Sequence, residues 1–423
     1  MKHLGILVAV LGGLGLAQTA STPSAWTMYQ YVPSHNAVLP GPSTGYQWTF
    51  TIQGNIVGGL ALANGVLYVE SFDHHLYALD PTNGKVLWSF DTGQVIMTTP
   101  IVADGVVVVG SGTNAVLDDL PDKVDWGVLP PADAVYALNA QTGALLWNHV
   151  TVGEDMPSPV YTNGTIIWGN GHDVAQAANL QTGQILWRTP LQGVVTMSSA
   201  NMAGGMVYMV AGMGPHSTLA FPVNTYALNP QTGAVIWKAP YGNGDCSPTV
   251  GDGLVFVEGA EQVPGSSQEV NLVDALDAQT GQLVWSYVSA PGYNDTTASN
   301  EQGIAGVYHD GILYQALPMS DQFAAFDAKT GKVLWITKTA GPIKMSAVVH
   351  QGKVYAGDGA GNLYVFDAKT GAILYERHFP APFTPSSPVI WGDTLFIATG
   401  YHNKPEGTLY AIPLESLEAS AAR

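Results

Sequence analysis

Apolar and polar positions alternate along this chain in one short pattern that recurs. In Leu76–Trp88 (LYALDPTNGKVLW), an alternating stretch is followed by a turn ending in Asn-Gly and by a short apolar run that closes on Trp. Alternation with a period of two predicts a strand, and the turn residues predict a tight connection to a second strand. The pattern therefore predicts a β-hairpin.

Seven copies of this hairpin follow one another along the chain. Their closing aromatic residues stand 40 to 59 residues apart, at Trp88, Trp147, Trp187, Trp237, Trp285, Trp335 and Tyr375. A period of this length is typical of a four-stranded propeller blade. The repeated Trp offers a large apolar face and one N–H donor, so it is interpreted as a structural wedge between neighbouring blades.

The two ends of the chain supply an eighth unit. Thr408–Pro413 has the pattern of a first hairpin strand, and Thr44–Thr51 has the turn and the second strand, with Trp48 at the wedge position. Pairing these segments closes the ring and removes exposed edge strands. The sequence thus predicts an all-β protein, an eight-bladed β-propeller of four-stranded antiparallel blades over residues 44–413, closed by its N- and C-terminal strands.

Three short segments lie outside the predicted propeller. A basic start followed by the apolar run Leu4–Leu16 predicts a secretory signal peptide over residues 1–17, which is too short for a membrane anchor. Residues 18–43 are expected to form an extended lead-in, and residues 414–423 a C-terminal tail.

The chain has a single cysteine, Cys246. One cysteine excludes an intrachain disulfide, and this one does not follow the cleavage site, where a lipid anchor would be attached. We therefore expect a soluble exported protein, periplasmic or extracellular, without a transmembrane or lipid anchor.

Charge is sparse. Charged residues make up 11% of the chain, against about 25% in a typical soluble protein, and 14 basic residues face 32 acidic ones. A net charge of −18 argues against nucleic acid or an anionic bilayer as partner. Because few Lys and Arg remain to repel one another once carboxylates are protonated, the composition favours an acidic medium. The alternative is a secreted protein at neutral pH with an uncharged polar surface.

Loop lengths distinguish the two faces of the predicted disc. The turns that end the inner strands are short, and insertions occur in the other connections, at Thr113–Asp133, Met213–Asn224, Glu261–Asn271, Pro291–Gln302 and Tyr401–Gly407. All rise from one face, and long loops on a rigid scaffold commonly carry binding residues. The Asp cluster of the first insertion matches no EF-hand spacing, so no metal site is assigned.

Counting back eight positions from each inner-strand turn predicts the residues that ring the central channel. One register gives Val57, Met97, Met156, Met197, Asp245, Gly303, Lys344 and Pro385. The next gives Gly58, Thr98, Pro157, Ser198, Cys246, Ile304, Met345 and Ser386. Side chains of a strand alternate in direction, and the sequence leaves open which register faces inward.

These positions supply the candidate site residues. The candidate catalytic residues are Asp245 and Lys344, and the candidate ligand-binding residues are Met97, Met156, Met197, Cys246, Met345, Glu154 and Asp155. Each also has a structural interpretation, because Met commonly fills core gaps and a lone Cys is commonly an inert buried thiol. No zinc-ligand spacing, phosphate-binding loop, nucleophile elbow or haem attachment motif is present.

The repeated signature A-[LF]-[DN]-x-x-T-G-x-x-x-W, as at Ala78–Trp88, resembles the tryptophan-docking repeat of the pyrroloquinoline quinone (PQQ) propeller superfamily. The resemblance covers nearly the whole mature chain and implies the fold. This fold hosts unrelated functions, so several classes of protein have to be weighed.

Three classes of the superfamily come into question. Resemblance to quinoprotein dehydrogenases implies PQQ and calcium on the channel axis, beside an adjacent-cysteine disulfide that a chain with one cysteine cannot form. Resemblance to the outer-membrane assembly factor BamB implies a non-catalytic scaffold that holds envelope proteins. Resemblance to the tetrathionate hydrolases of acidophiles implies an exported enzyme that needs no PQQ. Position alone, and no matched motif, gives the hypothesis that Lys344 attracts the dianion and that Asp245 or Asp295 acts as acid or base. We expect a small ligand to be bound or processed at the channel mouth.

Overall fold

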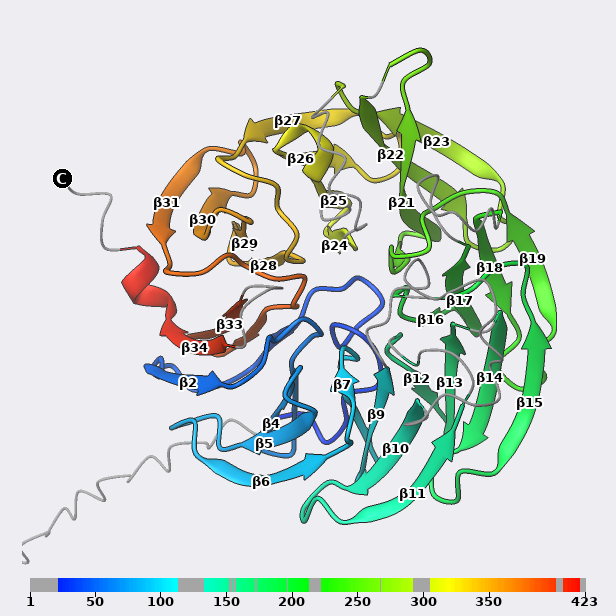
Figure 1. Cartoon of the computed structure of the whole chain (residues 1–423). Helices are drawn as coiled ribbons and strands as arrows, with labels where there is room; N and C mark the ends of the chain where they lie inside the picture. Colours follow the sequence, from blue (N-terminus) through cyan, green and yellow to red (C-terminus); the bar gives the residue numbers. More distant parts are fainter. Residues whose placement is uncertain are drawn as a thin grey trace, which may run out of the picture.

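The computed structural model describes residues 22–112, 133–151, 155, 157–171, 173–195, 197–212, 222–266, 268–291, 305–400 and 406–418. Within these ranges the chain forms eight antiparallel blades around a central axis (Figure 1), which confirms the predicted fold class. The helical elements described are two short 3-10 turns, η2 (Pro318–Ser320) and η3 (Leu414–Leu417). Among the described residues, no helix is long and apolar enough to cross a membrane.

The strands of the first four blades run from the axis outward. Blade 1 contains β3 (Ala61–Ala63), β4 (Val66–Glu70), β5 (His75–Leu79) and β6 (Val86–Asp91). Blade 2 contains β8 (Ile101–Ala103), β9 (Val106–Gly112), β10 (Ala134–Asn139) and β11 (Leu145–Val150), with β7 (Val95–Ile96) paired to β9. Blade 3 contains β12 (Val160–Thr162), β13 (Thr165–Asn170), β14 (Val174–Asn179) and β15 (Ile185–Pro190). Blade 4 contains β16 (Asn201–Ala203), β17 (Met206–Ala211), β18 (Asn224–Leu228) and β19 (Val235–Ala239).

The remaining blades follow the same plan. Blade 5 contains β20 (Thr249–Gly251), β21 (Leu254–Gln262), β22 (Glu269–Asp277) and β23 (Leu283–Val288). Blade 6 contains β24 (Val307–His309), β25 (Ile312–Leu317), β26 (Gln322–Asp327) and β27 (Val333–Lys338). Blade 7 contains β28 (Val348–His350), β29 (Lys353–Gly357), β30 (Asn362–Asp367) and β31 (Ile373–His378). Blade 8 contains β32 (Val389–Trp391), β33 (Thr394–Gly400), β34 (Gly407–Pro413) and the N-terminal β2 (Trp48–Ile52).

Closure of the ring occurs in blade 8, where the two ends of the chain meet. Strand β2 pairs antiparallel with β34, with Trp48 opposite Ala411 and Ile52 opposite Gly407. A second N-terminal strand, β1 (Val38–Leu39), pairs parallel with the innermost strand β32. The sequence predicted the first pairing but not the second.

The repeated Trp residues join each blade to the next. The indole Nε1 of Trp48, Trp88, Trp147, Trp187, Trp237, Trp285 and Trp335 donates to a carbonyl of the following blade at 2.8 to 3.2 Å. The ring also covers a turn glycine of that blade. At Gly331, where φ is +69°, an added Cβ would lie 2.6 Å from Trp285 Cδ2, so only glycine leaves room for the indole.

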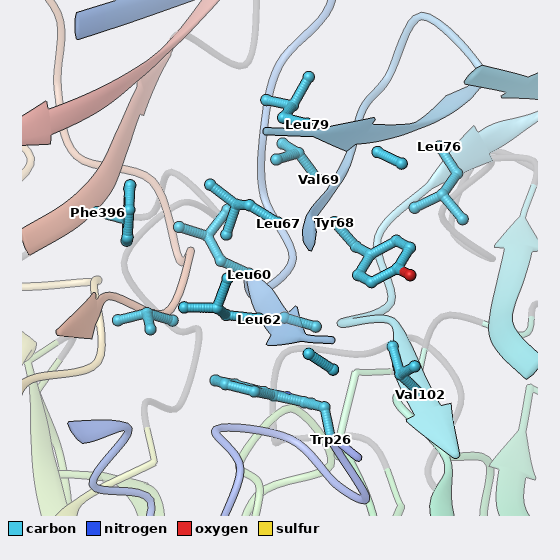
Figure 2. Close-up of a cluster of buried hydrophobic side chains, with 14 of the residues drawn as sticks. Trp26, Leu60, Leu62, Leu67, Tyr68, Val69, Leu76, Leu79, Val102 and Phe396 are labelled. Carbon is cyan, nitrogen blue, oxygen red and sulfur yellow. The ribbon is translucent and has the colours of Figure 1, made fainter. Parts of the chain in front are cut away.

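The N-terminal segment, residues 22–39, lies along the innermost strands of successive blades. Its Trp26 exchanges two backbone hydrogen bonds of 2.7 Å with Val102 and is fully buried under blades 1 and 2, beside Leu62 and Val102 (Figure 2). Further along, Pro33 O accepts from the backbone N–H of Val250 at 2.8 Å, and Ala37 O accepts from that of Ile390 at 2.9 Å. The segment is therefore packed into the propeller, which its sequence did not indicate.

Candidate functional site

A cavity lies on the channel axis. Residues of the first predicted register line it, namely Val57, Met97, Met197, Asp245, Lys344 and Pro385, together with Tyr29, Gly58, Ser158, Ser199, Ser247, Ala305 and Ser346. Most of these residues lie two or four positions before the start of an inner strand, and each inner strand runs from that end to a short turn. The cavity therefore faces the side of the disc that carries the long connections. Its volume is about 50 Å³, several times the roughly 10–15 Å³ that one water needs.

Asp245 and Lys344 both line this cavity, from blades 5 and 7. Lys344 is 9% exposed and Asp245 is partly buried. A carboxyl and an ammonium group that are buried or partly buried interact more strongly with a bound ligand than they would in bulk water. Met97 and Met197 add polarizable sulfur to the wall.

A layer of hydroxyl groups lies two residues beyond this register, and the sequence reasoning missed it. The backbone N–H of Thr99 donates to Ser158 Oγ at 2.8 Å, that of Ser158 to Ser199 Oγ at 3.0 Å, and that of Ser199 to Ser247 Oγ at 2.9 Å. Each bond joins one blade to the next around the channel. The recurrence of Ser at the same offset from the inner-strand turns was the available signal.

Cys246 and Met345 do not line the cavity, although each directly follows a lining residue, Asp245 and Lys344, in the chain. Cys246 is 1% exposed, and its Sγ accepts the backbone N–H of Glu258 at 3.2 Å. In blade 4 Ser198 Oγ accepts the N–H of Val210 in the same way, at 3.1 Å. Burial raises the pKa of the Cys246 thiol, with the Glu258 carboxylate adding to the effect. The thiol thus occupies a structural position of the repeat.

Asp155 also lies behind the wall of the cavity. It is fully buried, and its carboxyl accepts from Trp168 Nε1 at 3.0 Å and from the Thr151 hydroxyl. Burial raises its pKa to about 8, against the weaker opposing effect of these two donors. The other predicted residues Glu154, Met156 and Asp295 lie outside the described residues, as does most of the Asp-rich insertion.

Glu70 is a buried carboxyl next to the cavity that the sequence analysis did not single out. Its Oε1 accepts the backbone N–H groups of Val57 at 2.8 Å and of Gly58 at 2.5 Å. Its Oε2 has no partner, and burial raises the pKa of the group well above its ordinary value. Glu70 therefore holds the backbone of two residues that line the cavity.

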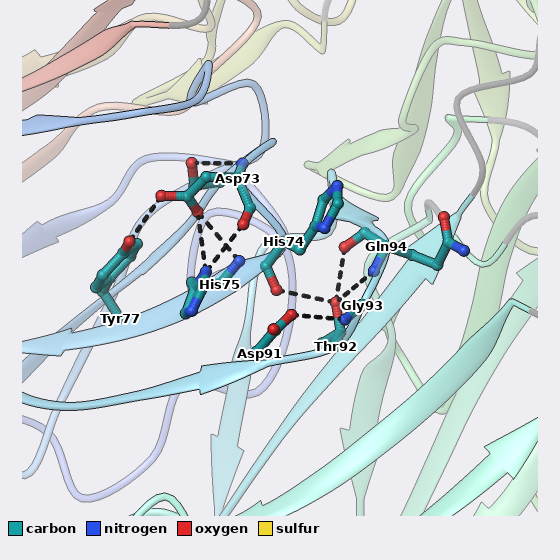
Figure 3. Close-up of polar contacts among 9 residues, drawn as sticks. Asp73, His74, His75, Tyr77, Asp91, Thr92, Gly93 and Gln94 are labelled. Carbon is teal, nitrogen blue, oxygen red and sulfur yellow. Dashed lines mark hydrogen bonds and ion pairs between the residues drawn. The ribbon is translucent and has the colours of Figure 1, made fainter. Parts of the chain in front are cut away.

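A polar cluster on blade 1 has a structural explanation. Asp73 accepts from the Tyr77 hydroxyl at 2.6 Å and from the backbone N–H of His75 at 3.1 Å, while Gly93 donates to Asp91 at 2.8 Å (Figure 3). These bonds fix the turn between β4 and β5 and the turn after β6. Within the described ranges no group of three or more His, Cys, Asp and Glu is placed to hold a metal ion.

The cavity residues do not fit PQQ with calcium. A tricyclic quinone needs a flat slot between two large rings, whereas Tyr29 is the one aromatic residue among the described lining residues, around about 50 Å³. The chain also has one cysteine and cannot form a disulfide cover. Asp245 is the one carboxylate among the lining residues described, fewer than the several oxygen ligands that calcium takes.

Comparison with known proteins gives a family match along most of the chain. The family model described as "Outer membrane protein assembly factor BamB" matches residues 41–127, 131–225, 222–292 and 269–416.

Three curated relatives span most of this chain. A tetrathionate hydrolase of Acidithiobacillus ferrooxidans is 27% identical over 93% of this chain and 87% of its own length. A tetrathionate hydrolase of Acidianus ambivalens is 29% identical over 85% of this chain and 71% of its own. A BamB of Moranella endobia is 23% identical over 83% of this chain and 86% of its own length.

Solved structures share the fold at lower identity. BamB from Moraxella catarrhalis aligns with a TM-score of 0.61 at 14% identity, covering 87% of this chain and all of its own. Quinohemoprotein alcohol dehydrogenase from Comamonas testosteroni aligns with a TM-score of 0.68 at 15% identity, covering 94% of this chain and 81% of its own. An assembly factor and an alcohol dehydrogenase thus share this fold, so the fold alone does not assign a function.

Proposed function

Because the chain belongs to the BamB-type family of PQQ-repeat propellers and has tetrathionate hydrolases among its relatives, we propose that it is an exported, cofactor-independent hydrolase of a polythionate. It acts in an acidic extracytoplasmic space. The observation that carries this proposal is the placement of Asp245 and Lys344 in one cavity, on the face with the long connections.

The chemistry of a polythionate matches this lining. Tetrathionate is a dianion with a sulfonate at each end of a short sulfur chain. Lys344 supplies a positive charge for a sulfonate, and the thioethers of Met97 and Met197 suit the polarizable inner sulfur atoms. The small cavity holds one end of the ligand, and the rest extends toward the open face.

Hydrolysis needs no redox partner. Water attacks one inner sulfur, the central S–S bond breaks, and its electron pair leaves with thiosulfate. The products are thiosulfate, a sulfenyl sulfonate (HO–S–SO₃⁻) and one proton, which together balance tetrathionate plus water. Asp245 acts as the acid and donates a proton to the leaving thiosulfate, and the proton that the attacking water releases replaces it. Lys344 stabilises the negative charge that gathers on the leaving thiosulfate.

Acid exposure agrees with the buried carboxyl groups. Burial raises the pKa of Glu70, Asp155 and Asp274, so the folded protein holds all three neutral over a wider pH range than the unfolded chain does. Such groups favour the folded state at low pH. A chain with 14 basic residues also avoids strong self-repulsion there.

The test is thiosulfate release from tetrathionate by the purified protein at about pH 3 and pH 7, without added PQQ. We expect turnover that is faster in acid and that falls by roughly two orders of magnitude or more in Asp245→Asn and Lys344→Ala. The matched controls are Asp252→Asn and Lys329→Ala, an exposed ion pair of 3.5 Å between two of the short turns. Turnover that survives both cavity variants would move the site elsewhere, and none at either pH would refute the hydrolase.

A scaffold for envelope proteins is the second candidate. Its support is the family description together with exposed apolar pairs that begin the outer strands, such as Val86 with Leu87 and Val235 with Ile236. An uncovered apolar rim of this kind suits a protein partner. Co-purification of another envelope protein, combined with no turnover, would favour this function over hydrolysis.

A further inference from the structure

The N-terminal segment carries one residue into the cavity. On one side of Tyr29, Thr27 O accepts from the backbone N–H of Tyr161 in blade 3 at 2.7 Å, and on the other, Pro33 O accepts from Asn201 Nδ2 of blade 4 at 2.9 Å. The Tyr29 side chain reaches across to blade 7, where its hydroxyl lies 3.0 Å from Ser346 Oγ. The Tyr29 side chain therefore reaches across the channel, and Tyr29 forms the floor of the cavity.

The position of the Tyr29 ring is fixed by a buried histidine. The ring lies edge-on to His35, with the two centroids 5.1 Å apart. His35 is 1% exposed and bonded on both ring nitrogens, with Thr249 Oγ1 at 2.9 Å and Asn201 Nδ2 at 3.1 Å. Since the Thr249 hydroxyl donates to Gly306 O at 2.7 Å, its oxygen accepts from His35 Nδ1. Burial lowers the pKa of His35 to about 3, so this neutral arrangement persists in acid.

The surroundings of the Tyr29 hydroxyl are rich in donors. Ser346 lies beside it, and the neighbouring Gln30 amide donates to Ser387 Oγ at 3.0 Å. Burial raises the pKa of the phenol, so it keeps its proton at acid and neutral pH. The floor of the cavity thus carries the hydroxyl groups of Tyr29 and Ser346.

The wall above the floor continues this character. The serine layer described above, here called the hydroxyl belt, consists of Ser158, Ser199 and Ser247. Each lines the cavity, and each hydroxyl oxygen accepts a hydrogen bond from a backbone N–H. An oxygen fixed as acceptor leaves its own hydrogen to be donated into the cavity. With the ammonium group of Lys344 in the same lining, the complementary ligand is a tetrahedral oxyanion group.

We propose that this cavity is a sulfonate subsite in which Tyr29, supplied by the N-terminal segment, donates a hydrogen bond to the bound group from the floor. The identification of the group as one end of a polythionate rests on the proposed function. The oxyanion subsite itself rests on the hydroxyl belt, Lys344 and Tyr29. Tyr29 is thus a binding residue that lies outside the repeats, in a stretch without any catalytic motif.

The test measures binding rather than turnover. Thiosulfate, which carries one sulfonate end of tetrathionate, is titrated calorimetrically into the purified full chain at about pH 6, with sodium chloride as the reference salt. A hydrogen bond to a charged group corresponds to roughly a ten- to hundredfold change in affinity. We therefore expect Tyr29→Phe to weaken thiosulfate binding by about tenfold or more.

Tyr31→Phe is the matched control, because Tyr31 lies on the same segment and does not line the cavity. Its ring is tilted against that of Trp26, with the centroids 5.1 Å apart. It should bind thiosulfate as the unaltered protein does. Thermal unfolding of both variants checks that the segment stays in place. If Tyr29→Phe proves unstable, Ser346→Ala replaces it, with the same expected loss of affinity.

The outcomes separate the subsite from the reaction. Thiosulfate binding that depends on Tyr29, with no tetrathionate turnover, would uphold the subsite and reject the hydrolase. Turnover with thiosulfate affinity unchanged in Tyr29→Phe would uphold the hydrolase and reject the role of Tyr29. Absence of thiosulfate binding to the unaltered protein would overturn the subsite altogether.

Discussion

Replacing Asp155 by Asn tests whether a buried neutral carboxyl adapts this protein to acid. The folded protein keeps the Asp155 proton up to a pKa of about 8, whereas the unfolded chain releases it near the ordinary value of 3.8. Between these two values the folded state binds more protons than the unfolded state. The free energy of unfolding therefore falls as pH rises through this window.

The magnitude follows from the distance between the two pKa values. At pH 7 the ionised form of Asp155 outweighs the protonated form in the unfolded chain by roughly three powers of ten, while the folded protein stays mostly protonated. This difference lowers the free energy of unfolding by about 4 kcal/mol as an upper value. Asn keeps both contacts at every pH, since its oxygen accepts from Trp168 Nε1 and its amide donates to the Thr151 hydroxyl. We expect Asp155→Asn to equal the unaltered protein near pH 4 and to be more stable at pH 7 by up to about 4 kcal/mol.

The assay is urea unfolding followed by Trp fluorescence at several pH values between 4 and 8. His35 changes stability in the opposite direction, because its folded pKa of about 3 lies below its ordinary 6.5, and the stability it gives is lost as pH falls through this range. The difference between variant and unaltered protein cancels this contribution. Asp310→Asn, at a carboxyl that is 89% exposed, is the control. Parallel stability profiles for Asp155→Asn and the unaltered protein would refute the reasoning.

Three further predictions concern the repeat and the cavity. Gly331→Ala should lower the free energy of unfolding by about 1–3 kcal/mol more than Gly311→Ala does. Both glycines have positive φ, but only at Gly331 would an added Cβ contact an indole ring. Equal losses in urea unfolding would contradict the role of the Trp residues as wedges between blades. Cys246 should react with a thiol reagent only after unfolding, and Cys246→Ser should keep fold and turnover, since Ser198 fills the equivalent position; rapid labelling of the native protein would place the thiol in an open site. Reconstitution with PQQ and calcium should leave no quinone absorbance after gel filtration, and retained absorbance would show that the cavity opens further than its lining suggests.

Much of the fold could be predicted because each blade is specified locally. The period-two alternation, the Thr-Gly turn and the closing Trp all lie within one hairpin. Each copy therefore contains the residues that determine its own local structure. The pairing of Thr44–Thr51 with Thr408–Pro413 could be predicted as well, since each was an incomplete copy of the same unit. Counting from the turns also brought Asp245 and Lys344 to the channel, where both line the cavity.

The rest required tertiary structure, because it depends on contacts between residues far apart in the chain. Alternation along a strand gives two registers, and only the packed ring decides that Asp245 faces the cavity while Cys246 faces Glu258. Tyr29 lies outside the repeats, so no periodicity could place it 3.0 Å from Ser346. The sequence by itself determined an eight-bladed ring and the strands that surround its axis. The packing of the N-terminal segment against the innermost strands decided which groups form a site, since burial and proximity arise only when the blades close.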